Sequence, residues 1–135
     1  MKDGICEFIF RKSSNNFFEF SLDILGSIGY SCVNPYFNKI FLWLGDTGDE
    51  TESSDIAEMH RLLPNEESAA LTMWNGTDDI WVEVEMAVSS EFNVLTIDPR
   101  LLSLENGQRI IDGIYREISA RDHIKNLSRI IIDKS

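Results

Sequence analysis

The sequence contains few of the residues that bind metals or form covalent cross-links. Its 135 residues include two cysteines and two histidines. Cys6 and Cys32 do not form a Cys-x-x-Cys pair, which excludes zinc-ribbon and thioredoxin-like spacings, and we expect both thiols to be buried as small apolar side chains. No His-x-x-x-His pair, Gly-x-Ser-x-Gly elbow or phosphate-binding loop is present. We therefore predict no metal site, no cofactor and no enzymatic activity.

Long apolar runs are also missing. The longest, residues 40–44, has five members, whereas a membrane-spanning helix needs about 20. The first residues include acids where a secretory signal would need an apolar stretch, so we expect no targeting segment and a cytoplasmic location. The length and the ordinary apolar content, 43%, predict a single globular domain over residues 1–135.

Basic residues are scarce in the middle of the chain. Residues 40–99 contain fourteen acidic residues and one basic residue, Arg61, whereas residues 1–39 contain four of each and residues 100–135 contain five acidic and seven basic residues. The middle segment would be repelled by nucleic-acid phosphates and by anionic membranes. It would attract a basic protein and accelerate its association. We therefore expect no direct nucleic-acid or membrane partner, and nothing in the sequence fixes an oligomeric state.

The hydrophobic pattern predicts an α+β fold, mainly an antiparallel sheet of about five strands with two to three helices packed on it. Strands are predicted over residues 5–10, 38–44, 69–74, 80–88 and 92–97, with residues 130–132 as a last strand or packed tail. Residues 45–54 read as a loop. Helices are predicted over residues 54–63 and from Asp98-Pro99 to near Ala120, where Asn106-Gly107 could interrupt the second.

Residues 17–30 fit two patterns. Phe18, Leu22, Leu25 and Ile28 fall on one helical face, but Phe18, Phe20, Leu22 and Ile24 also alternate with polar residues as in a strand. We favour the helix because the segment is long and Gly29 could end it.

A hairpin at Asn75-Gly76 is predicted to form a two-aromatic surface. Asn-Gly suits a type I′ turn, and a two-residue turn there would place Ala70 opposite Trp81, with Trp74 on the same outer face as Trp81. A longer loop over residues 75–79 would instead turn Trp74 inward. Along the second strand Trp81 alternates with apolar residues and shares its face with Glu83 and Glu85, which resist burial because an unpaired buried carboxylate is costly.

These observations indicate a surface that binds a basic partner protein, with a tryptophan as its apolar anchor. The predicted partner-binding residues are Asp46, Asp49, Glu50, Glu52, Asp55, Trp74, Asp78, Asp79, Trp81, Glu83 and Glu85.

The acid-rich stretch from Asp46 to Glu85 and the Trp81-x-Glu83-x-Glu85 strand make the chain similar in character to bacterial immunity proteins of contact-dependent growth inhibition systems. The resemblance lies in composition and architecture. It implies an immunity protein that binds a cognate toxin domain, often a basic nuclease, and occludes its active site. Two alternatives stay open: a nucleic-acid-mimicking inhibitor or an adaptor, and a small enzyme or ligand-binding domain that uses His60 or His123.

Overall fold

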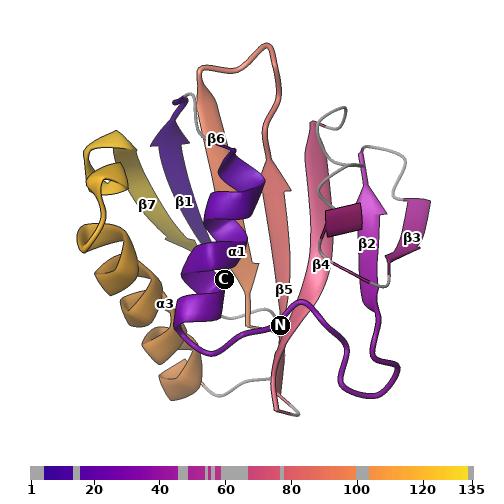
Figure 1. The fold of residues 1–135 in the computed structure, drawn as a ribbon. Helices are drawn as coiled ribbons and strands as arrows, with labels where there is room; N and C mark the ends of the chain where they lie inside the picture. Colours follow the sequence, from indigo (N-terminus) through magenta and orange to yellow (C-terminus); the bar gives the residue numbers. More distant parts are fainter. Residues whose placement is uncertain are drawn as a thin grey trace.

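The structure is a computed structural model in which α1 and α3 cover one face of an antiparallel sheet (Figure 1). It describes residues 5–13, 16–45, 49–53, 55, 57–58, 67–76, 78–99 and 104–133. The strands are β1 (Ile5–Arg11), β2 (Ile40–Leu44), β3 (Asp49–Ser53), β4 (Ser68–Asn75), β5 (Asp78–Glu85), β6 (Phe92–Asp98) and β7 (Leu127–Asp133). The helices are α1 (Phe17–Ser27), α3 (Leu104–Ser119) and the 3-10 helix η2 (Asp122–Asn126).

The seven described strands form one sheet in the order β3-β2-β4-β5-β6-β1-β7, and every neighbouring pair is antiparallel. This confirms the α+β class but exceeds the predicted five strands. One added strand, β3, lies in the segment 45–54 that was predicted as a loop. Its residues are polar, yet they pair along all of β2, because an edge strand needs only backbone hydrogen bonds on one side. The other is β7, where residues 130–132 were predicted as a last strand or packed tail; the strand is longer, Leu127–Asp133, and pairs with β1.

Residues 17–27 are helical, as favoured over the strand. Asn16 caps the first turn, where its Oδ1 accepts a hydrogen bond of 3.0 Å from the Glu19 amide. Beyond the last turn Gly29 has a φ of 99°, and the Tyr30 amide donates back to the Leu25 carbonyl at 3.0 Å. The predicted glycine stop is confirmed, because this left-handed conformation costs glycine little.

The second predicted helix begins later than expected. Asp98 is the last residue of β6 and Pro99 lies outside the helix, so the predicted start at Asp98-Pro99 is wrong; α3 begins at Leu104. Asn106 and Gly107 lie within α3 and do not interrupt it. Most of the predicted helix over residues 54–63 lies outside the described residues.

The core lies between the helices and the inner face of the sheet. Alternate residues of the strands, such as Phe8, Leu71 and Val82, are fully buried there against apolar residues of α1 and α3. Val88, predicted to continue the inner row of the strand 80–88, instead lies beyond β5 and is 84% exposed. None of the helices that the structure describes combines the length and apolar character needed to cross a membrane.

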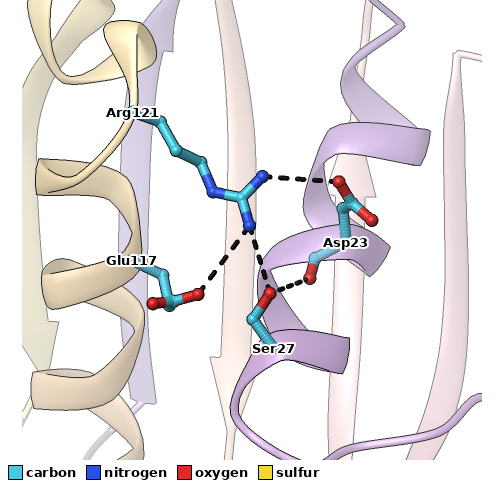
Figure 2. Close-up of polar contacts among 4 residues, drawn as sticks. All are labelled: Asp23, Ser27, Glu117 and Arg121. Carbon is cyan, nitrogen blue, oxygen red and sulfur yellow. Dashed lines mark hydrogen bonds and ion pairs between the residues drawn. The ribbon is translucent and has the colours of Figure 1, made fainter.

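A polar cluster joins the end of α3 to α1 (Figure 2). The guanidinium of Arg121 lies 3.3 Å from Asp23 Oδ2, donates to Ser27 Oγ at 3.1 Å, and lies 3.8 Å from Glu117 Oε1. Ser27 also donates to the Asp23 carbonyl at 3.0 Å. The cluster therefore links α1 to the end of α3 on the face of the sheet that the two helices cover.

Candidate protein-binding face

The register of β4 and β5 places both tryptophans of the hairpin on the outer face. Trp81 pairs with Thr72, and Asn75 pairs with Asp78, so the predicted pairing of Ala70 with Trp81 is wrong by two residues. A two-residue shift leaves every side chain on its face, because side chains alternate with a period of two. Trp74 therefore shares the outer face with Trp81, and the longer loop that would turn it inward does not occur.

A pair of tryptophans lies at the centre of this face. β2 lies beside β4. Ala70 of β4 pairs with Trp43 of β2 on one side and with Glu83 of β5 on the other. The rings of Trp43 and Trp81 pack with centroids 5.2 Å apart at 54°. The Trp81 indole Nε1 donates to Glu83 Oε1 at 2.9 Å, so the carboxylate fixes the ring while both groups stay half-buried.

A second group of aromatic residues extends the surface toward the loop that precedes β2. Tyr36 packs edge-on against Trp74 at 5.8 Å, and Phe37 against Phe41 at 6.1 Å. The loop holds these rings because Asn34 Oδ1 accepts from the amides of both Tyr36 and Phe37. Tyr36 and Phe37 are 66% and 68% exposed, so the aromatic surface is open to solvent.

Carboxylates surround the aromatic residues. The strands β3, β2, β4 and β5 contain seven acidic residues and no basic residue. The alternation along β3 and β5 puts Glu50, Glu52, Asp79, Glu83 and Glu85 on the outer face. Lys39 from the preceding loop lies 3.2 Å from Glu52. We call this surface the aromatic–acidic face, defined by Tyr36, Phe37, Phe41, Trp43, Glu50, Glu52, Trp74, Asp79, Trp81, Glu83 and Glu85.

Seven of the eleven predicted site residues belong to the aromatic–acidic face. Asp78 does not, because its side chain alternates to the other face of β5, where it lines a cavity with Tyr30 and Arg109. Asp55 lies beyond β3, where its Oδ1 accepts from the Glu58 amide at 2.7 Å. Asp46 and the side chain of Asp49 lie outside the described residues.

Four residues of the face were missed by the sequence reasoning: Tyr36, Phe37, Phe41 and Trp43. Residues 38–44 are apolar on both faces at their end, which pointed to an interior strand. The structure confirms that β2 has neighbours on both sides, but its outer side chains are half-buried. The sequence did contain a usable signal: Phe41 and Trp43 are two residues apart in a strand, so their side chains lie on the same face whatever the neighbouring strand.

One cavity and two histidines bear on the alternative of an enzyme or ligand-binding domain. A cavity of about 500 Å³ lies between α1, residues 30–32 and Met73 of β4, and its described lining includes Glu19, Asp23 and Cys32. His60 and the side chain of His123 lie outside the described residues. The described residues contain no group of three or more His, Cys, Asp or Glu side chains that could hold a metal ion.

The thiols are held in their neutral form. Burial, with a smaller effect of Glu7, raises the pKa of Cys6 from 9.0 to about 12, and burial also raises the pKa of Cys32. Both cysteines are free and buried, as expected. A protonated, inaccessible thiol is a poor nucleophile and a poor metal ligand.

The aromatic–acidic face is thus the arrangement of the described residues with the clearest functional chemistry. In comparisons with known proteins, no family model, no curated protein and no solved structure matches this chain.

Proposed function

We propose that the chain is an immunity protein that binds a basic toxin domain through the aromatic–acidic face and so blocks the toxin's active site. The observation that carries the proposal is the Trp43–Trp81 pair, which stands between carboxylates on a face that neither α1 nor α3 covers (Figure 1). The compositional resemblance to immunity proteins of contact-dependent growth inhibition supports the choice of a toxin as the partner.

The aromatic residues would supply the binding energy. Tryptophan and tyrosine dominate protein-binding hot spots because each removes a large apolar area from water while keeping a polar group. Here Trp81 is already held by Glu83, so little side-chain entropy remains to be lost on binding. Lysine and arginine side chains of the partner could lie over the tryptophan rings as well as beside the carboxylates.

The carboxylates would supply specificity and speed. Five acids of β3 and β5 lie on the outer face, with Glu50, Glu52 and Glu85 exposed and Asp79 and Glu83 half-buried, and the strands β2 and β4 between them contain no basic residue. Such a surface steers a basic domain toward it, and it would occupy the lysine and arginine groups that a nuclease uses to bind phosphates. Inhibition would then follow from occlusion, with no chemistry on the immunity side.

A protection assay in cells tests the function directly. The polypeptide encoded next to this chain is expressed with and without it, and growth is followed. We expect the neighbour to be toxic alone and harmless with this chain, and the two proteins to elute as one complex in gel filtration. A harmless neighbour that forms no complex would contradict the proposal.

Matched variants then test the face. We expect Trp81→Ala and Trp43→Ala each to weaken binding at least 10-fold, which corresponds to about 1.4 kcal/mol. Tyr115→Ala is the control, because Tyr115 is a 48% exposed aromatic residue on α3, away from the face. Equal losses from Tyr115→Ala and Trp81→Ala would show that another surface binds.

Salt separates the electrostatic part of the proposal from the aromatic part. We expect the association rate to fall by 10-fold or more when NaCl rises from about 0.05 M to about 0.5 M, while the dissociation rate changes little. Glu83→Gln and Glu85→Gln should reduce this salt dependence, whereas Glu105→Gln on α3 should not. An association rate independent of salt would remove the electrostatic role of the acids.

A further inference from the structure

Among the described residues, the edge strand β7 carries two neighbouring exposed apolar side chains, Ile131 and Ile132. β7 ends the sheet and, within the part of the chain that the structure describes, pairs only with β1. Ile131 is 37% and Ile132 is 40% exposed. The first lies on the outer face beside Glu7, and the second lies on the helix-covered face beside Cys6.

Because Ile131 and Ile132 are exposed on opposite faces of β7, an added strand would cover them better than a helix or a loop would. A helix or loop laid over the sheet would bury one of these two isoleucines and leave the other in water. A strand added to the edge would reduce the exposure of both, and would also pair the outward-pointing backbone groups of β7. The register of β7 against β1 is irregular only near Phe10 and regular from Arg129 to Asp133, so five residues are available for such pairing.

A second copy of this chain can supply that strand without bringing the two acid-rich regions together. Each copy carries a net charge of −11, but residues 100–135, which include α3, η2 and β7, are net positive. Joined at β7, the nearest acid-rich strands, β5 of each copy, would lie seven strand spacings apart, or about 34 Å. This separation is several times the Debye length of about 8 Å at physiological ionic strength.

We propose that the chain forms a two-fold dimer in which the β7 strands of two copies pair antiparallel about Ile131 and make one continuous sheet. In this register Ile131 meets Ile131 of the second copy, and Ile130 meets Ile132. The same register brings the positions of Arg129 and Asp133, which differ in charge, opposite one another. A register centred on Ile130 would instead pair Ile132 with Ser128.

The proposed dimer does not depend on the function proposed above, but it has a consequence for that function. A two-fold axis that relates paired antiparallel strands runs perpendicular to the sheet at the axis, so both outer faces belong to the same side of the continuous, twisted sheet. Two aromatic–acidic faces would lie at the two ends of one sheet. The dimer would therefore bind two partner molecules, or two sites on one partner with increased avidity.

Substitutions of opposite charge at the symmetry axis test the proposal in the 135-residue chain. Ile131→Lys and Ile131→Glu each place like charges against each other, so both variants should sediment as monomers where the wild type sediments as a dimer. Mixed in equal amounts, the two variants should form a dimer again. Val88→Lys and Val88→Glu are the controls, because Val88 is exposed outside the strands, and both should remain dimeric.

Each remaining outcome overturns the proposal. Wild-type protein that stays monomeric from low micromolar to high micromolar concentration, variants of Ile131 that remain dimeric, or a mixture that remains monomeric would each do so. Far-ultraviolet circular dichroism checks that the variants are folded.

Cross-linking provides a second readout if a charged variant fails to fold. Paired antiparallel residues have Cα atoms 4.5–5.5 Å apart, within disulfide range. Under mild oxidation, Ile131→Cys should therefore form a disulfide-linked dimer in high yield and Val88→Cys should not. Cys6 and Cys32 are buried and should not compete. Equal yields from the two variants would contradict pairing at β7.

Discussion

Cys6 is the residue whose chemistry depends most on the fold. It lies on β1, next to the edge strand β7, and has no exposed surface, so its pKa is raised to about 12 because a thiolate there would lose its hydration. Sulfur at this position acts as a small apolar group. The consequence is visible only in alkali, where the unfolded chain ionises first.

We predict that the free energy of unfolding falls between about pH 9 and pH 12 through Cys6. The unfolded thiol loses its proton near 9.0 and the folded thiol near 12, so in this window the unfolded state binds fewer protons and stability decreases as the pH rises. Urea unfolding at a series of pH values measures the slope. Cys6→Ala should decrease less steeply; identical slopes would show that other groups cause the loss.

Arg121 makes polar contacts that link two helices. Its guanidinium contacts three groups on two helices, and its side chain is only 31% exposed. We expect Arg121→Ala to lower the free energy of unfolding by about 1–2 kcal/mol. Arg109→Ala is the matched control: its single pair with Glu105 is highly exposed, so the expected cost is about 0.3–0.5 kcal/mol. Equal costs in chemical denaturation would contradict a role for the cluster.

At the scale of elements, Gly113 of α3 lies against Ile28, the residue that follows α1. A Cβ built on Gly113 would lie 3.2 Å from Ile28 Cγ2, whereas one on Gly107 of the same helix would lie 3.5 Å from Pro99. The first distance is tighter than ordinary van der Waals contact and the second is ordinary. Both glycines lie on the buried side of α3, but only at Gly113 would a side chain be too close to its neighbour.

We predict opposite effects of substitution at these two positions. Gly107→Ala should raise the free energy of unfolding by about 0.5–1 kcal/mol, because alanine favours the helix and has room. Gly113→Leu should lower it by about 1–3 kcal/mol, because the added atoms must displace Ile28. Thermal unfolding monitored by circular dichroism is sufficient. A Gly113→Leu variant as stable as the wild type would show that α1 and α3 separate easily.

The hairpin of β4 and β5 shows how an element can be predicted on the right face but in the wrong register. The signal Asn75-Gly76 correctly located a turn, and Gly76 has a φ of 64°. The strands nevertheless pair through Asn75 and Asp78, two residues from the expected alignment. Because the error was even, the inner and outer rows were predicted correctly; an error of one residue would have exchanged them.

For the whole molecule, charge is distributed unevenly across the sheet. Seven acids and no bases occur in β3, β2, β4 and β5, whereas β1 and β7 carry Arg11 and Arg129. Like charges on one face repel one another in the free protein. This repulsion lowers the stability of the uncomplexed chain and would be relieved by a basic partner.

We predict that salt stabilises the free protein. Raising NaCl should increase the free energy of unfolding, since screening reduces repulsion among the outer-face acids more than it weakens the few exposed ion pairs. Glu85→Gln should add a few tenths of a kcal/mol at low salt, whereas Glu105→Gln, which removes a partner of Arg109, should not. Denaturant titrations at two salt concentrations measure both effects; stability that falls with salt would contradict the argument.

The sequence by itself determined the features that depend on near neighbours. The period-two pattern of residues 80–85 placed Trp81, Glu83 and Glu85 together. The Asn16 cap and Gly29 delimited α1, and the composition located the excess acid. Each of these follows from side-chain geometry and turn conformation within one or two consecutive elements, where the competing arrangements are few.

Only the tertiary structure decided which strands lie side by side. β2 lies beside β4, which brings Trp43 against Trp81, and β1 inserts between β6 and β7, which leaves Ile131 and Ile132 at an edge. The lateral order of strands is selected by the apolar surface that the whole sheet buries against α1 and α3. That free energy is a sum over contacts between segments distant in the chain, and no local pattern of residues encodes it.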